Sequence, residues 1–310
     1  MPEAYPAAPA SLSGDLLSLN RFLASPTLIQ RRLREYTDLR FVSDQLLTQR
    51  YRSSGGAVLY GVSEPIVNTR PVEAVSAGGE YPLDTPPTGT AAVAAVTKWG
   101  QSTILTDEAV SRNANPGTVA DRVLRKVINS IIKQVDSVTI SAIASAVTAN
   151  AAATAAWSAA SGTNILRDIE LAKAKIIDLN QGYMPNAILM SSTKYAYMAS
   201  DAVITNIRQR ETTDNPVYTG EIDVIGGLTV IAAPLTSLPS DDVWVFDTAQ
   251  LGGMADEVDG APGYSVADMA VEVQTKRLEE RDSWRLWGRR KTVPVIQEPG
   301  AGFKITGTSS

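Results

Sequence analysis

Residues 115–147 read NPGTVADRVLRKVINSIIKQVDSVTISAIASAV and carry the strongest periodic pattern in the chain. Asn115 and Pro116 are residues that commonly begin a helix. Apolar residues then recur at three- and four-residue spacing, which is typical of a helix with one buried face. These residues are Val119, Val123, Val127, Ile131, Val135 and Val138. The pattern predicts one helix about 50 Å long, and a helix of that length is unusual in a compact domain.

The segment before this helix, residues 58–98, has the composition of extended chain. Val58, Tyr60 and Val62 alternate with small residues, as in a strand. Residues 82–89 contain three prolines, which exclude a helix there. The sequence therefore predicts a long hairpin with a tip rich in Gly and Pro. Such a hairpin has too few bulky apolar residues to form its own core, so we expect it to be covered by another surface or to stay mobile.

Residues 1–57 are expected to form an N-terminal arm that contains a helix at about Leu28–Arg40. Arginine is dense in this arm and is only partly offset by acids. The arginines are Arg21, Arg31, Arg32, Arg34, Arg40, Arg50 and Arg52. They either contact an acidic partner or lie on a solvated helix face, and the second role is the commoner one for such residues.

The segment after the long helix has the alternating helices and short strands of an α+β domain. The pattern predicts an amphipathic helix at Asn164–Leu179, with Leu179 on its buried face. A buried strand and a short helix are expected at Ala187–Met190 and Ser192–Ala199, and a hairpin with a two-glycine turn at residues 222–232. The remaining strands are expected at Val243–Phe246, Val271–Leu278, Arg285–Val295 and Phe303–Thr306.

Cysteine and histidine are both absent from the 310 residues. Without cysteine there is no disulfide, thiolate metal ligand or cysteine nucleophile. Without histidine there is no Ser-His-Asp relay, no histidine base and no ordinary zinc site. The formal net charge of −5 gives no reason to expect a protein that grips nucleic acid through bulk positive charge. We expect no catalytic, cofactor-binding or metal-binding residue.

A stretch without charge, Ser137–Leu166, is long enough to span a membrane. It consists mostly of Ala, Ser, Thr and Asn, which favours a helix end followed by an Ala-rich loop. Charge is instead segregated further along the chain. Residues 211–275 contain 12 acids and no basic residue, whereas residues 277–291 are strongly basic. In an assembly, such an acidic face of one copy could meet a basic face of the next.

Two acidic clusters contain the carboxylates that a calcium site needs. The pair Asp241–Asp242 and the cluster at residues 256–259 lack the spacing of a calcium loop, so they are expected to be solvated loop acids. Trp284 and Trp287 lie among arginines and could stack on bases, but packing in a core or a subunit interface is the commoner role. No glycine-rich stretch is followed by the lysine of a phosphate loop, and no serine lies in a Gly-x-Ser-x-Gly elbow.

Four motifs resemble the major capsid proteins of tailed bacteriophages, the family with the Hong Kong 97-like fold that encapsulin shells also use. They are VTKWGQSTILTDEAV at 96–110, PNAILMSSTKYAYM at 185–198, IGGLTVIAAPLTSLPSDDVWVFD at 225–247 and WRLWGRRKTVPVIQEPGAGFKIT at 284–306. In that family, such motifs lie at the exit from an extended loop, in an axial domain and in the closing strands of a peripheral domain. Each motif is a weak packing pattern, but their joint order is fairly specific and covers the chain from about residue 60 onward.

The resemblance implies an α+β, Hong Kong 97-like phage capsid fold. Its expected parts are an N-terminal arm at 1–57, an extended β-hairpin loop at 58–100, a peripheral domain with a long spine helix at 101–162, an axial domain at 163–255 and return strands of the peripheral domain at 256–310. The implied function is self-assembly into the icosahedral head of a tailed double-stranded DNA phage, which is built in the bacterial cytoplasm and becomes part of the virion.

The resemblance implies partners rather than ligands, with no membrane among them. They are other copies of the chain in hexamers and pentamers, a separate scaffolding protein, a portal, an optional decoration protein and packaged double-stranded DNA through weak non-specific contact. The residues expected at assembly contacts are Arg70, Glu73, Glu80, Asp84, Arg285, Arg289, Arg290 and Lys291. Some members of the family crosslink their subunits covalently through a lysine of the loop. Residues 51–97 contain no lysine here, so no such crosslink is expected at the loop tip.

Two alternatives remain open at this point. An encapsulin-type compartment shell would enclose a cargo enzyme, and neighbouring genes would distinguish it from a phage protein. A carboxylate-dependent hydrolase would need paired buried acids in a cleft, whereas the acids of this chain cluster in loop-like stretches.

Overall fold

The computed structural model describes residues 41–111, 116–159, 162–204, 222–258, 261–266 and 270–309. The helix expected at Leu28–Arg40 lies outside these residues. Within them, the chain forms two compact units. Unit 1 contains residues 98–132 and 258–291, and unit 2 contains residues 41–97, 133–257 and 292–310.

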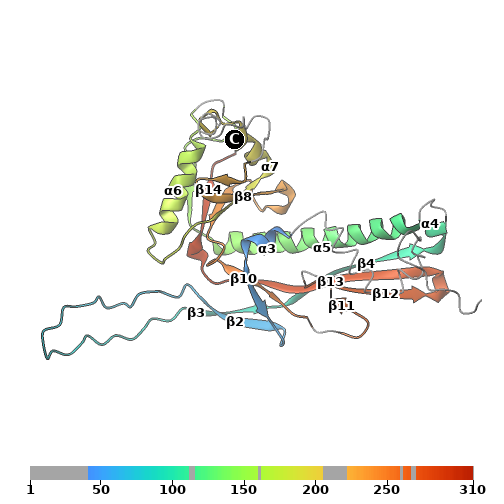
Figure 1. Cartoon of the computed structure of the whole chain (residues 1–310), viewed down its shortest axis with the longest axis horizontal. Coiled ribbons are helices and arrows are strands. Elements are labelled where there is room, and N and C mark those ends of the chain that lie inside the picture. The colour runs from blue at the N-terminus through green and yellow to red at the C-terminus, as the bar shows by residue number, and fades with distance from the viewer. Residues whose placement is uncertain are drawn as a thin grey trace, which may run out of the picture. The chain divides into compact units, whose positions relative to one another are not determined.

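Unit 1 is built on an antiparallel sheet and the first part of the long helix. Its elements are β4 (Thr97–Thr106), α4 (Asp107–Ser111), α5 (Pro116–Ala146) as far as residue 132, β11 (Ser265–Val266), β12 (Glu272–Leu278), η3 (Glu279–Arg281) and β13 (Ser283–Ile296) as far as residue 291. β12 pairs with β13, with Glu272 opposite Arg289 and Leu278 opposite Ser283. β11 pairs with β12, and β4 pairs with β13 (Figure 1).

The predicted long helix is confirmed as α5, which has 31 residues. In unit 1 its apolar stripe meets β13 at Gly288. A Cβ atom at Gly288 would lie 3.0 Å from the Cδ1 atom of Ile131 and 3.1 Å from a Cγ atom of Val127. Glycine therefore lets the strand approach the helix closely, and burial of the stripe compensates for the modest helix propensity of its β-branched residues.

Unit 2 contains a second sheet and most of the short helices. Its elements are α3 (Val42–Leu46), β1 (Gln49–Arg52), β2 (Ala57–Val62), β3 (Thr90–Ala95), β5 (Asn150–Ala152), α6 (Ile165–Ile177), β6 (Ala187–Ser191), α7 (Ser192–Ser200), β7 (Val224–Ile225), β8 (Leu228–Ala233), η1 (Leu235–Ser237), β9 (Val243–Phe246), β10 (Gly252–Asp256), η4 (Pro299–Ala301) and β14 (Gly302–Thr306). The last parts of α5 and β13 also belong to this unit.

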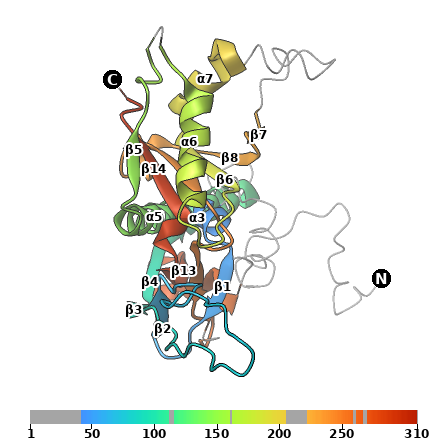
Figure 2. The same cartoon turned by 90° about the vertical axis from the view of Figure 1, so that its left-hand side faces the viewer.

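The larger sheet of unit 2 has the strand order β5-β14-β9-β6-β8-β7. Every residue of β6 and β9 is buried, as their unbroken apolar sequences predict. α6 packs across β14 and β9 (Figure 2) and confirms the expected amphipathic helix. Leu179 is a correction, because α6 ends at Ile177 and 48% of the Leu179 side chain is exposed.

Residues 41–52, which the sequence placed in the arm, are packed into unit 2. Phe41, Leu46 and Leu47 are almost completely buried. The carboxylate of Asp136 on α5 accepts hydrogen bonds from the backbone amides of Val42 at 3.2 Å and of residue 43 at 3.0 Å. These two contacts cap the first turn of α3, so this part of the chain is held by both apolar burial and a buried charge.

β10 was not predicted from the sequence, because it begins with two glycines that are typical of a loop. It pairs in parallel with β1, with Gly253 opposite Gln49, and in antiparallel with β13. A Cβ atom at Gly253 would lie 2.4 Å from the backbone oxygen of Gln49. The glycine is therefore required by the close approach of β1 and not by a turn.

The uncharged stretch at residues 137–166 contains the end of α5, the strand β5 and a turn, as an Ala-rich connection would. Among the helices that the structure describes, none combines the length and the hydropathy that crossing a membrane requires.

Candidate assembly surfaces

The most exposed apolar side chains of the described chain lie in the loop between β2 and β3. Residues 63–89 contain no helix or strand and run as two extended limbs that meet at a tip (Figure 1). The exposed fraction is 99% for Val72, 82% for Tyr81 and 89% for Leu83. Large apolar side chains that are exposed to this extent on one loop mark a site that binds another molecule or another copy.

Three of the loop residues expected at assembly contacts also contact one another within the chain. The backbone amide of Arg70 donates to Oδ2 of Asp84 at 2.8 Å, and its guanidinium donates to the backbone oxygen of Leu83 at 3.3 Å. The same guanidinium binds the Glu73 carboxylate at 3.0 and 3.1 Å. Glu80 is exposed and makes no hydrogen bond or ion pair with another described residue.

The outgoing limb of the loop is anchored to unit 2 at its base. The amides of Ser63 and Glu64 donate to Gln297 O at 2.9 Å and to Glu298 Oε1 at 3.1 Å. The amide of the residue two positions later, at 66, donates to Oε1 of Gln181 at 3.3 Å. Ser63 has a φ of +54°, a conformation that side chains other than glycine rarely adopt. The base is therefore a defined structure held by specific acceptors.

Glu298 also connects this base to the core of unit 2. Its Oε2 atom accepts a hydrogen bond of 2.8 Å from the hydroxyl of Tyr183. Burial raises the pKa of Tyr183, and the nearby Glu298 carboxylate raises it further. A cavity of about 210 Å³ lies beside these groups and is lined by Ser63, Glu64, Pro65, Leu179, Gln181, Tyr183, Glu298 and Gly300. Tyr183 therefore stays a neutral donor, which suits a structural contact.

The basic residues of β13 divide between the surface and the interior. Arg285 is half-buried, donates to Ser102 Oγ at 3.1 Å and lies 4.7 Å from the ring centroid of Trp287. Arg289 binds the buried carboxylate of Glu272 and lies 3.7 Å from the ring centroid of Tyr264. These contacts agree with packing as the role of Trp287 and leave the Arg289 charge largely neutralised within the chain.

Arg290 is a correction to the expected set of assembly contacts. Its side chain is completely buried, because alternation along β13 turns it to the face opposite Arg289. A residue without exposed surface is not available to a neighbouring copy in this conformation. Lys291, the next residue, is half-buried.

Unit 1 has a surface groove of about 570 Å³ that the sequence did not predict. Apolar residues from two strands, Ile104 and Leu278, line it together with four cations and two acids. The complete lining is Ile104, Lys276, Arg277, Leu278, Glu279, Glu280, Arg281 and Arg285. Arg277 is paired with the Asp107 carboxylate, but Lys276 and Arg281 are exposed. The groove therefore combines two apolar residues with exposed charges of both signs, Lys276 and Arg281 beside Glu279 and Glu280.

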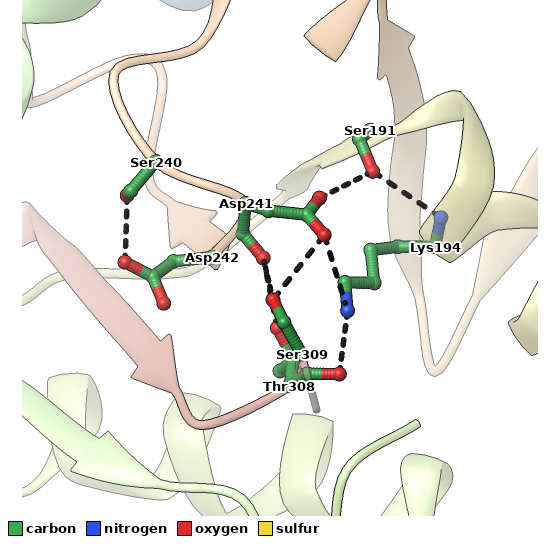
Figure 3. Close-up of polar contacts among 7 residues, drawn as sticks. All are labelled: Ser191, Lys194, Ser240, Asp241, Asp242, Thr308 and Ser309. Atoms are coloured by element: carbon green, nitrogen blue, oxygen red, sulfur yellow. Dashed lines mark hydrogen bonds and ion pairs between the residues drawn. The ribbon is translucent and has the colours of Figure 1, made fainter. Parts of the chain in front are cut away.

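Asp241 corrects the expectation that the pair at 241–242 is solvated. It lies beside Lys194, whose side chain is 2% exposed, with an Nζ–Oδ2 distance of 3.3 Å (Figure 3). Lys194 Nζ also donates to the backbone oxygen of Thr308, and Ser191 Oγ donates to Asp241 Oδ1 at 2.7 Å. A buried lysine is stable only when paired, so this cluster holds the segment after β14 in place.

The other buried acids also serve structural contacts. Asp168 accepts from the amide and the hydroxyl of Thr154 at 3.1 and 2.6 Å. Asp247 accepts from the amides of Met184 at 2.8 Å and Ala249 at 3.0 Å. In the part of the chain that the structure describes, no three acids come together as a metal site would require. The arrangement supports contacts between surfaces better than it supports acid–base chemistry.

Comparisons with known proteins agree with this arrangement. The sequence matches the phage capsid protein family over residues 89–305. No curated protein matches it significantly. The fold is similar to a chain in the capsid structure of cyanophage P-SCSP1u, with a TM-score of 0.64 and 12% identity over 98% of this chain and 94% of that one.

Two further solved structures show how widely this fold is used. A chain from Mycobacterium phage Che8 has a TM-score of 0.57 and 11% identity over 87% of this chain and 93% of that one. A chain of the holo-SrpI encapsulin complex from Synechococcus elongatus has a TM-score of 0.52 and 10% identity, with 86% of each chain covered. At these identities the similarity establishes the mixed helix-and-strand fold of capsid structures and no more.

Proposed function

This chain belongs to the phage capsid protein family, and from that premise we propose that it is the major capsid protein that self-assembles into the icosahedral head of a tailed, double-stranded DNA bacteriophage. The loop at residues 63–89 carries this proposal, because its nearly fully exposed apolar side chains require a cover. In a closed shell, neighbouring copies supply that cover, and many modest contacts per subunit add up to a stable particle.

Each part of the chain has a proposed place in the shell. The part of unit 2 around α6 and the β5-to-β7 sheet gathers around five- and six-fold axes, and the long helix with the C-terminal strands forms a plate. The loop lies over a neighbouring copy. Copies in hexamers and pentamers build the shell in the host cytoplasm with a scaffolding protein and a portal, and a decoration protein is optional.

We propose a purely structural role without catalysis. The buried acids have structural partners, and the mild net charge of −5 keeps contact with packaged DNA weak and non-specific. Residues 51–97 contain no lysine, which supports a shell without isopeptide crosslinks at the loop tip.

Electron microscopy of the purified full-length chain, with and without its scaffolding protein, tests this function. The expected result is closed shells or free hexamers and pentamers. A chain that stays monomeric at high concentration in both conditions would contradict the proposal.

The alternative is an encapsulin-type compartment. The observation that supports it is the structural similarity to the SrpI encapsulin chain. The contents of particles purified from the natural source separate the two functions. A phage head contains double-stranded DNA and absorbs strongly at 260 nm, whereas a compartment shell contains a protein cargo visible as a second band on a denaturing gel.

A further inference from the structure

The loop at residues 63–89 has one place where its two limbs are joined. Within the described residues, the hydrogen bonds that cross between the limbs both come from Arg70: its amide reaches Asp84 Oδ2, and its Nη1 atom reaches Leu83 O. We propose that Arg70 is a positioning residue that joins the limbs so that Val72, Tyr81 and Leu83 form one apolar surface, which a groove of a second copy receives. This inference rests on the proposed function and extends it to the residues that meet.

The Arg70 contacts are weak in the free chain and become stronger when another copy covers the loop. The side chains of Arg70 and Glu73 are 45% and 53% exposed. Their ion pair lies within the outgoing limb, and the exposed bonds from Arg70 that cross to the return limb shift an equilibrium by only roughly 2- to 5-fold. In the free chain Arg70 therefore biases the loop toward the joined form without fixing it. When another copy covers the loop and excludes water, the same hydrogen bonds become stronger, so joining and covering reinforce each other.

Charge and apolar residues indicate a second copy of the chain as the occupant of the loop surface. Residues 63–89 contain four acids and one arginine. The lining of the unit 1 groove contains the apolar residues Ile104 and Leu278 and the exposed cations Lys276 and Arg281. The apolar side chains of the loop fit the two apolar residues of the groove, and the loop acids can pair with its exposed cations. Glu279 and Glu280 in the same lining repel those acids, so the charges restrict the orientation in which the loop docks. A second copy of the chain brings both surfaces.

The role of Arg70 is tested by the concentration of free chain that remains in equilibrium with assembled particles, measured by sedimentation. Arg70→Ala keeps the backbone amide that donates to Asp84 and removes the guanidinium bond to the Leu83 oxygen, so we expect it to raise this concentration roughly 2-fold. Glu80→Ala is the matched control, because it removes an exposed charge of the same loop that has no described partner. Equal behaviour of Arg70→Ala and the wild type would overturn the proposal, whereas failure of the wild type to assemble would overturn the proposed function instead.

A disulfide distinguishes positioning from direct contact with the second copy. The chain has no cysteine, so the double variant Arg70→Cys/Asp84→Cys contains a single thiol pair that joins the same two limbs. Oxidation is expected to restore assembly to the wild-type level, and reduction is expected to lower it below that of Arg70→Ala, because the Asp84 acceptor is then missing as well. If Arg70 acted by touching the second copy, oxidation would not restore assembly. A disulfide that does not form in the folded chain would show that the limbs lie apart, and would overturn the proposal as well.

The receiving groove is tested by crosslinking between copies. In assembled particles of Leu83→Cys/Ile104→Cys, oxidation is expected to give a ladder of covalent multimers on a denaturing gel. Leu83→Cys/Leu235→Cys is the control, since Leu235 is similarly exposed but lies outside the groove. Multimers from the control and none from the groove variant would place the loop on a different surface and overturn this part of the inference.

Discussion

The carboxylate of Asp107 binds the guanidinium of Arg277 at two points, with nitrogen–oxygen distances of 2.7 and 2.6 Å across 170 positions of the sequence. The pair joins the start of α4 to β12 within unit 1. Asp107 N also donates to the backbone oxygen of Asp282 at 3.0 Å. The turn that leads from β4 toward the long helix is therefore tied to the β12–β13 connection by a side-chain pair and a backbone bond.

This pair predicts a specific dependence on pH. The side-chain hydrogen bond from Arg277 lowers the pKa of Asp107 below its usual value of 3.8. The pair therefore stabilises the fold above pH 3.8, and that contribution is lost as the pH falls through the lower, folded-state pKa. Asp107→Asn should melt at a lower temperature than the wild type at neutral pH, and the difference should shrink in strong acid. Glu108→Gln, a change of the exposed neighbour, is the control and should show no such convergence.

Removal of the Lys194 ammonium should destabilise unit 2 strongly. Lys194→Met leaves Asp241 without its cation and Thr308 O without its donor. Breaking a buried ion pair costs about 3–5 kcal/mol, and we expect the lower end because the Asp241 side chain is 28% exposed. Urea unfolding measures the loss, and Lys194→Met/Asp241→Asn should recover part of it. Lys175→Met, on the exposed face of α6, should be neutral, and an equal loss there would argue against the pairing.

Gly253→Ala should loosen residues 41–52 from unit 2. The added Cβ atom would lie 2.4 Å from the Gln49 backbone oxygen, so β1 must move away from β10. Overpacking of this kind costs about 1–3 kcal/mol. Gly61→Ala is the matched change within a strand, because nothing lies within 4 Å of its Cβ position. Limited proteolysis should cut the Gly253→Ala variant near β1 earlier than the wild type, and equal cutting rates would contradict the expected displacement.

The stability that Asp136 contributes should change with pH in the opposite direction to that of Asp107. Burial raises the pKa of Asp136, while hydrogen bonds from Ser43 and Val42 oppose that rise. A raised folded-state pKa means that the group contributes less stability as the pH rises from 3.8 through the raised value. The melting temperature of Asp136→Asn relative to the wild type should therefore increase over this range. Asp136→Ala, which removes both acceptors, should lose about 1–3 kcal/mol, and a difference independent of pH for Asp136→Asn would exclude this explanation.

The sequence predicted the elements whose signals are local. α5 begins at Pro116 and ends at Ala146, close to the expected 115–147, because a helix is specified by its own apolar period. The β7–β8 hairpin follows in the same way from the turn at Gly226 and Gly227. The mixed helix-and-strand fold of capsid proteins, expected from the order of four motifs, is confirmed at that level.

The parts that were missed depend on contacts between distant segments. β1 and β10 pair with each other although about two hundred positions separate them in the sequence. Neither strand has a local pattern that distinguishes it from a loop. The contact of Arg70 with Asp84 follows from how the two limbs of the loop are aligned, which composition does not specify. No local pattern indicates that Lys194 is buried, because a lysine in a short helix is normally solvated and only the tertiary structure buries it.

The loop at residues 63–89 is attached unequally on its two sides. Among the described hydrogen bonds, three amides of the outgoing limb bind acceptors in unit 2, whereas the return limb from Tyr81 to Gly89 has none of that kind. The two limbs should therefore differ in how well they tolerate insertions and deletions. Insertions and deletions near Thr85, before the close approach of Gly89 to Val62, change the reach of the loop without disturbing its root. Length variation among descendants of this sequence should therefore accumulate there, and foreign epitopes should be accepted there more readily than beside Ser63.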